Sequence, residues 1–67
     1  MIAIPGEERA IGRGRYAVTK VDVSDDSGGR AVVYFVDDWL TGKYCDITSA
    51  GELTDAEILA KAGRAIA

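Results

Sequence analysis

The chain has 67 residues, a net charge of −3 at pH 7, one cysteine and no histidine. This length leaves room for one domain, expected to span residues 1–67, whose small core gives a thin margin of stability. The lack of histidine excludes Ser–His and Cys–His catalysis and the usual zinc sites, and the single cysteine excludes an internal disulfide.

The first strong strand signal covers residues 15–23, where apolar and polar side chains alternate with one slip. Before it, residues 2–4 favour a short strand that ends at Pro5, and the glycine-rich run 12–15 predicts a flexible connection. The apolar residues of the longer strand divide between its two faces: Tyr16 and Val18 on one, Val21 and Val23 on the other. A β-bulge near Thr19–Lys20 would return them all to one face, so a bulge within this strand is predicted.

Residues 24–29 form the clearest turn signal, because Asp, Ser and two glycines favour local hydrogen bonds and positive φ. Segments rich in strand-forming residues flank this turn, so it predicts a hairpin loop. The returning strand, residues 30–36, has apolar side chains on both faces. Such a run is typical of a central strand that is covered on both sides.

A second connection covers residues 37–42 and contains Trp39. It leads into a third strand at residues 43–48, in which Cys45 and Ile47 share one face. A neighbouring carboxylate raises the pKa of a thiol, so Cys45 is expected to be a small core residue and not a nucleophile.

The last predicted element is a C-terminal helix that begins after Thr54. Thr54 and Glu57 have the spacing of a capping box, in which each side chain bonds the backbone N–H of the other residue. Leu53 and Ile58 have the spacing of a hydrophobic staple across the same turn. The apolar stripe expected to face the core consists of Ile58, Leu59, Ala62, Ala65 and Ile66.

Together these elements predict an α+β fold, in which a three-stranded antiparallel β-meander packs on one C-terminal α-helix. A short extra N-terminal strand at residues 2–4 stays open as an addition to the sheet. A small SH3-like barrel with an appended helix is the alternative fold. Neither fold implies a function by itself.

Carboxylates are the groups left for catalysis or metal binding, and no constellation of them supports either. Residues 22–28 resemble the start of an EF-hand calcium loop, but Ser27 stands where glycine is required and Val33 where glutamate is required. Asp37 and Asp38 lack a companion motif, so their expected role is loop solubility. We therefore expect a protein that is not an enzyme and that needs no metal, cofactor or small-molecule substrate.

The positive signal is an excess of apolar surface. One helix can cover one face of the sheet, whereas the central strand has apolar residues for both faces. Aromatic residues on an uncovered face are typical of a protein interface. The residues expected at this interface are Tyr16, Val33, Phe35, Trp39 and Tyr44. In the alternative arrangement, residues 2–11 fold over that face and close the core.

The leading functional hypothesis is a small protein–protein interaction module. Since no disulfide or metal stabilises it, a domain of this size is expected to form a homodimer, or to act as an accessory or inhibitor subunit of a larger complex. Small acidic chains with few motifs are also common among accessory proteins of phages and mobile elements. The second hypothesis is a weak, salt-sensitive nucleic-acid binder. Its candidate residues are the bases of an N-terminal stretch without acids: Arg9, Arg13, Arg15 and Lys20.

Nothing in the sequence predicts secretion or membrane insertion. The apolar residues 1–4 are followed by Pro5-Gly6 and two glutamates, which makes the segment too short and too acidic for a secretory signal. No apolar run has the length of a membrane span. With a free cysteine, the expected location is cytoplasmic.

Overall fold

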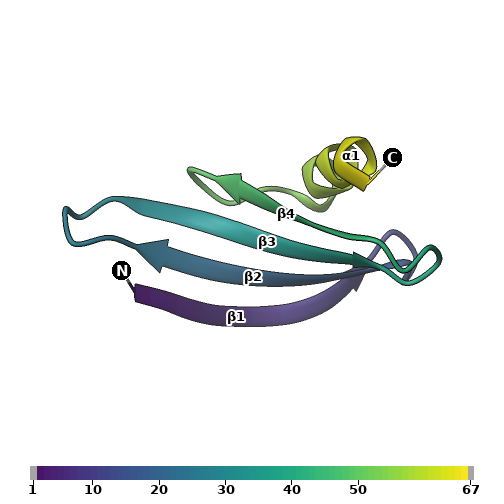
Figure 1. Cartoon of the computed structure of the whole chain (residues 1–67), viewed down its shortest axis with the longest axis horizontal. Helices are drawn as coiled ribbons and strands as arrows, with labels where there is room; N and C mark the ends of the chain where they lie inside the picture. Colours follow the sequence, from purple (N-terminus) through teal and green to yellow (C-terminus); the bar gives the residue numbers. More distant parts are fainter. Residues whose placement is uncertain (1, 67) are drawn as a thin grey trace.

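The computed structural model of the chain describes residues 2–66, and the side chains of residues 6–66. Its strands form one antiparallel sheet in the order β1-β2-β3-β4, and a single helix follows them (Figure 1). In chain order the elements are β1 (Ile2–Ile11), β2 (Tyr16–Ser24), β3 (Arg30–Asp38), β4 (Tyr44–Ser49) and α1 (Asp55–Ile66). The predicted α+β fold, an antiparallel meander with a C-terminal helix packed on it, is confirmed. The N-terminal strand is longer than predicted, since it has 10 residues and does not end at residue 4.

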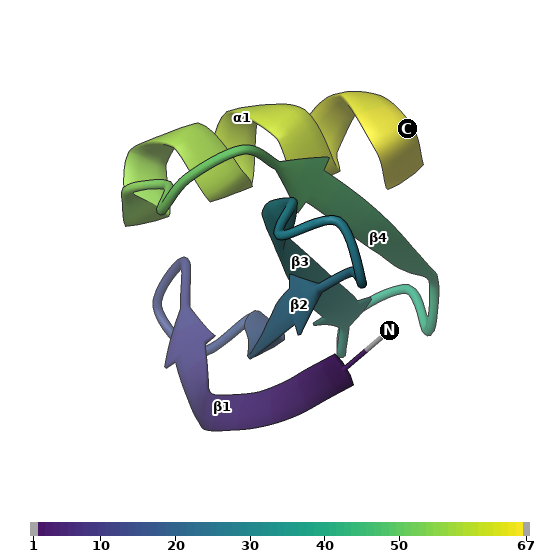
Figure 2. The same ribbon diagram turned by 90° about the vertical axis from the view of Figure 1, so that its left-hand side faces the viewer.

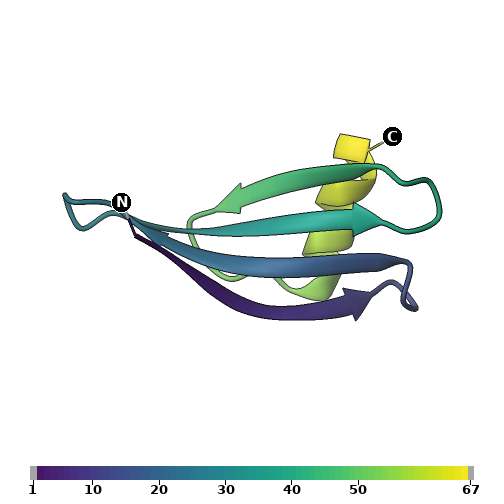
Figure 3. The ribbon, with the colours of Figure 1, turned by 60° about the horizontal axis from the view of Figure 1, so that its bottom comes forward.

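The helix and the sheet form two layers. α1 lies across one face of the sheet, and β1 bends toward the start of the helix (Figure 2). No other element of the described chain covers the opposite face, which lies toward the viewer in Figure 3. Residues 2–11 do not fold over this face, because they pair with the edge of β2 from Ile2↔Ser24 to Ile11↔Tyr16. We call the two surfaces of the sheet the helix face and the open face.

The pairing of β2 with β3 is uninterrupted along the whole of both strands. The bulge predicted within β2 is therefore wrong, and the register shift lies in β1 instead, between Pro5 and Glu8, opposite Lys20. The physical reason is that this sheet places apolar side chains on both faces. Val21 and Val23 lie on the open face, where they are partly buried, and no bulge is needed to turn them inward.

The core lies between α1 and the helix face. Alternate residues of β3 point into it, and Tyr34 and Val36 are only 2% and 1% exposed. From the helix, Ile58 and Ala62 are completely buried, whereas Ala65 of the predicted stripe is exposed. The buried cluster consists of Ile11, Val18, Val32, Tyr34, Val36, Ile47, Ile58 and Ala62. The partly buried residues packed against it are Tyr16, Cys45, Leu53, Leu59 and Ile66.

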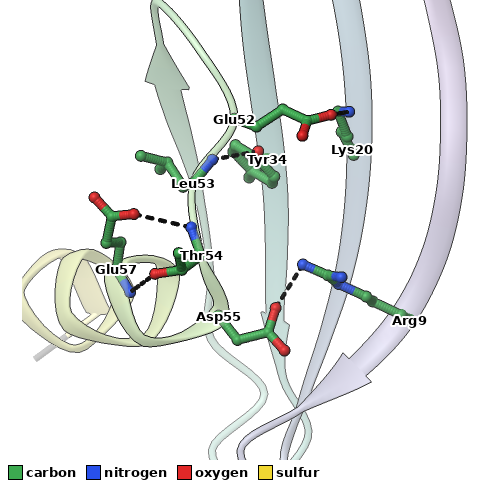
Figure 4. Close-up of polar contacts among 8 residues, drawn as sticks. All are labelled: Arg9, Lys20, Tyr34, Glu52, Leu53, Thr54, Asp55 and Glu57. Atoms are coloured by element: carbon green, nitrogen blue, oxygen red, sulfur yellow. Dashed lines mark hydrogen bonds and ion pairs between the residues drawn. The ribbon is translucent and has the colours of Figure 1, made fainter.

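The helix begins with the predicted capping box (Figure 4). The backbone N–H of Glu57 donates to the Thr54 hydroxyl at 3.2 Å, and the backbone N–H of Thr54 donates to the Glu57 carboxylate at 3.0 Å. These hydrogen bonds lower the pKa of Glu57 and fix the first turn of the helix. α1 has 12 residues, and the described part of the chain contains no helix long and apolar enough to cross a membrane.

The segment between β4 and α1 is held against the helix face by polar contacts (Figure 4). The backbone N–H of Leu53 donates to the Tyr34 hydroxyl at 2.8 Å, which satisfies the polar end of a buried ring. Two ion pairs flank this hydrogen bond: Lys20–Glu52 and Arg9–Asp55. Through Tyr34, the central strand β3 thus also fixes the path of the chain into the helix.

Replacing Tyr34 with phenylalanine is expected to lower the free energy of unfolding by about 1 kcal/mol. The ring stays in the core, but the N–H of Leu53 loses its acceptor. The control is Tyr44→Phe, because the Tyr44 side chain is 79% exposed, and its expected change is below about 0.5 kcal/mol. Urea unfolding followed by circular dichroism measures both variants. Equal losses would contradict the role given to the Tyr34 hydroxyl.

The β2–β3 connection is the predicted hairpin loop. One carboxylate oxygen of Asp25 accepts from the Ser27 hydroxyl, the Ser27 N–H and the Gly29 N–H, at distances of 2.7 to 3.0 Å. These donors lower the pKa of Asp25. Of the residues that resemble the start of a calcium loop, the first three end β2 and the others belong to an Asx turn around Asp25 that closes on itself.

Candidate protein interface

Large exposed apolar side chains gather on one β-hairpin. Within the described chain they are Phe35, Trp39, Leu40 and Tyr44, which are 47%, 72%, 75% and 79% exposed. All of them belong to β3, β4 or the turn between these strands. We call this set the hairpin patch. Single exposed apolar residues are ordinary on protein surfaces, but a contiguous group is typical of a binding site.

The two strand residues of the patch are neighbours on the open face. Phe35 lies opposite Asp46, and Tyr44 lies opposite Asp37, so the two aromatic residues are diagonal partners across β3 and β4. Diagonal positions on one face of an antiparallel pair are within reach of aromatic side chains. Val33 continues the same face along β3 and is partly buried. The open face therefore carries a continuous apolar strip that leads to the β3–β4 turn.

The turn itself is held by the buried carboxylate of Asp38, which is 2% exposed. Its side chain accepts from the N–H of Leu40 at 2.9 Å and from the hydroxyl of Thr41 at 3.0 Å. Its backbone accepts from the N–H of Gly42 at 2.8 Å and donates to the carbonyl of Lys43 at 2.7 Å. Gly42 has a φ of 74°, a conformation that glycine adopts without strain. Trp39 and Leu40 are thus carried by a closed turn and not by a loose loop.

The β1–β2 turn supports the β3–β4 turn through Arg15, the residue that directly precedes β2. Its guanidinium forms a two-pronged ion pair with Asp38, with N–O distances of 3.0 and 2.9 Å. The backbone carbonyl of Arg15 accepts from the N–H of Trp39 at 3.0 Å. The hydrogen bond from Arg15 is the main cause that holds the pKa of Asp38 far below its usual range, against the opposing effect of burial. The guanidinium also lies 5.1 Å from the ring centroid of Tyr16.

The hairpin patch overlaps the interface predicted from the sequence but is not identical to it. Phe35, Trp39 and Tyr44 are exposed there, and Val33 lies beside them on the open face. Tyr16 lies on the helix face instead, partly buried against the core. Its position follows from the uninterrupted alternation of β2, which places it on the same face as a fully buried valine two residues later.

Two residues of this site were not found by sequence reasoning. Leu40 follows Trp39 in the turn, and its apolar side chain in a polar connection was an available signal. Asp37 and Asp38 are expected from the sequence to serve loop solubility, but both belong to β3, where Asp37 is exposed on the open face and Asp38 is the buried centre of the turn. Its partner Arg15 is 23 residues away along the chain, and nothing local marks the pair.

The bases proposed for nucleic-acid binding are not brought together into one patch. Arg9 and Lys20 lie on the helix face, each in an ion pair, and Arg15 is engaged with Asp38. Arg13 lies exposed in the β1–β2 turn, with a positive φ of 59°. The ion pair with Glu52 raises the pKa of Lys20 and lowers that of Glu52. Three of the four bases are therefore already neutralised within the molecule.

A hollow beside the sheet is bordered by the same ion pairs. It has a volume of about 530 Å³ and lies between the helix face and the β4–α1 segment, with Arg9, Lys20, Glu52 and Asp55 among its lining residues. Within residues 2–66 no group of three or more potential metal ligands occurs. Cys45 is partly buried, and burial is the main cause that raises the pKa of its thiol.

Comparison of the chain with protein-family models, with curated proteins and with solved structures found no match. The apolar side chains of the candidate interface are exposed and belong to one hairpin, and the turn that carries Trp39 and Leu40 is fixed by hydrogen bonds within itself and to Arg15 of the β1–β2 turn.

Proposed function

We propose that this protein is an interaction module that binds another protein molecule through the hairpin patch. The observation that carries the proposal is the confinement of the large exposed apolar side chains of the described chain to one hairpin. Tryptophan and tyrosine are among the residues that most often dominate binding energy at protein interfaces. A turn that is already ordered also loses little conformational entropy when a partner binds.

The module has two possible forms: a homodimer, or an accessory or inhibitor subunit of a larger complex. In both, a domain with a small core gains stability from its partner by mass action. Size-exclusion chromatography with light scattering, at low and high salt, separates them. A dimer at both salt concentrations favours self-association, and a monomer at both favours a different partner.

Trp39 supplies a built-in probe of binding, since it is the single tryptophan of the chain and is 72% exposed. The emission of an exposed indole is expected to shift to shorter wavelength when a partner buries it. For a homodimer the shift follows protein concentration. For another partner, proteins retained on the immobilised chain from a lysate of the cells that make it are purified and titrated one at a time.

The decisive variant is the double substitution Trp39→Ala and Leu40→Ala, which we call the patch variant. Both side chains are exposed, and Trp39 and Leu40 enter the hydrogen bonds of the turn through their backbone N–H groups, so the fold is expected to persist. Affinity, measured by calorimetry, is expected to fall at least about 100-fold, as is typical when two anchor residues are truncated. Lys61→Ala, at an exposed position of α1, is the control and keeps the affinity. A purified partner that binds the patch variant as tightly as the wild type would refute the proposal.

A further inference from the structure

Charge divides between the two faces of the sheet. By the alternation of side chains along the strands, the charged residues on the open face are Glu8, Asp37 and Asp46, and all of these carboxylates are exposed. Asp37 and Asp46 lie opposite the aromatic residues of the hairpin patch. Among the described strand residues, no lysine or arginine lies on this face.

The bases lie on the other side of the molecule. Arg9 and Lys20 are paired with carboxylates beside α1, and Lys61 and Arg64 belong to α1 itself. The remaining bases of the helix side line two hollows. Arg15 and Lys43 line one together with Ile66 of α1. Arg30 lines the other together with Glu52 of the β4–α1 segment. Arg13, in the β1–β2 turn, is the one base outside this grouping within the described chain. The open face is therefore apolar along its centre and uniformly acidic in its charges.

We infer that the open face and the hairpin patch bind a basic protein partner, which presents an apolar centre flanked by lysine or arginine. This inference rests on the proposed function and adds the chemistry of the partner. The apolar centre covers Phe35 and Tyr44, and the partner's bases lie over Asp37 and Asp46. Complementary charge around an apolar centre speeds association and selects among partners.

A second copy of the chain fits this face poorly. In a two-fold symmetric dimer the same surface is used twice, so Glu8, Asp37 and Asp46 of one copy would face the same carboxylates of the other. No base of the open face is available to neutralise them. Nucleic acid is disfavoured for the same reason, since its phosphates would approach a negative surface.

A random peptide library displayed on phage is the probe, and the whole protein is the target. Selected sequences are expected to be enriched in lysine or arginine next to aliphatic or aromatic residues. The corresponding synthetic peptides are then titrated against the protein, with Trp39 emission as the readout. Their dissociation constants are expected to rise about tenfold between 50 mM and 500 mM salt, because the charges involved are exposed and are screened by salt.

A matched pair of charge reversals tests the role of the open face. Asp46→Lys and Asp22→Lys change the net charge equally, and both positions are exposed strand residues. Asp46 lies on the open face, whereas Asp22 lies on the helix face, where it lines a hollow with Lys20 and Tyr34. Asp46→Lys is expected to weaken the selected peptides about tenfold, through lost attraction and added repulsion, and Asp22→Lys is expected to change affinity less than about twofold.

The outcomes separate this inference from the proposed function. Basic peptides that lose affinity with Asp46→Lys and with the patch variant support both. Peptides that need Trp39 and Leu40 but are neutral or acidic overturn the basic partner and leave the interaction module standing. Peptides that bind the patch variant unchanged, or a selection that yields no sequence, overturn both. A dimer in light scattering that the patch variant dissociates assigns the face to a second copy and overturns the basic partner alone.

Discussion

Replacing Ile58 with alanine is expected to lower the free energy of unfolding by about 2–5 kcal/mol, because it empties a completely buried position between helix and sheet. Domains of this kind have a total stability of about 5–15 kcal/mol, and a chain of 67 residues belongs near the lower end. The variant is therefore expected to unfold at a temperature lower by at least about 10 °C. Thermal and urea unfolding at one protein concentration measure the loss.

Leu40→Ala is the matched control for this prediction. It also truncates a branched aliphatic side chain, but at a position that is 75% exposed, so the expected change in stability is below about 0.5 kcal/mol. Ile58→Val removes a single methyl group and is expected to cost about 1 kcal/mol. If Ile58→Ala were no more destabilising than Leu40→Ala, the docking of α1 through its buried stripe would be wrong.

Asp38→Asn is expected to destabilise the protein at neutral pH and to loosen the β3–β4 turn. The variant keeps the size of the side chain but replaces the charge that Arg15 pairs with, and hydrogen bonds to charged groups are stronger than neutral ones. The unfolding temperature is expected to fall by about 5 °C or more. Hydrogen exchange at the N–H of Leu40 is expected to accelerate, since that N–H donates to the same carboxylate.

The pH dependence of this difference has a definite sign. The pKa of Asp38 is lowered in the folded state, so the stability it contributes is complete above the pKa of an unfolded aspartate, about 3.9. That contribution is lost as the pH falls from this value toward the folded-state pKa. The difference in unfolding temperature between wild type and Asp38→Asn is therefore expected to be constant from about pH 5 to pH 8 and to shrink below about pH 4.

Asp37→Asn serves as the neighbouring control, because Asp37 is exposed on the open face and Asp38 is buried. It removes the same charge from the same strand, and it is expected to leave both the unfolding temperature and the exchange of Leu40 nearly unchanged. A difference between wild type and Asp38→Asn that grew at low pH would contradict the ion pair as the source of the effect.

The sequence predicted well those elements that are determined by residues close together in the chain. The capping box of Thr54 and Glu57, and the turn around Asp25, depend on side chains that bond the backbone two to four residues away. The length of β1 could not be predicted from such local patterns. Its bulge breaks the alternation of side chains, and Glu7, Glu8 and Arg9 resemble a polar loop although they form an edge strand with one solvent-facing side.

The exposed residues of the hairpin patch were predicted in part, for a related reason. Phe35, Trp39 and Tyr44 stand out as aromatic residues beyond what one helix can cover, and that count needs no coordinates. The support of the turn depends on where two turns meet in space. Arg15 and Asp38 come together because the β1–β2 and β3–β4 turns lie at the same end of the sheet, which only the register of β2 with β3 specifies.

The bulge in β1 makes the number of residues between Pro5 and Glu8 as important as their identity. Up to Pro5 the strand pairs in one frame with β2, and from Glu8 onward it pairs in a frame displaced by one residue. Deleting one residue in this interval would leave a single residue opposite Lys20 and remove the bulge, with Ile11 still opposite Tyr16 but without the irregularity that bends the strand. Gly6 cannot be exchanged freely either, since a Cβ there would lie 2.8 Å from the Lys20 carbonyl oxygen. The length of this interval thus sets the bend of the edge strand toward the start of the helix, whereas a change of length in the exposed β2–β3 loop is expected to leave the sheet unaltered.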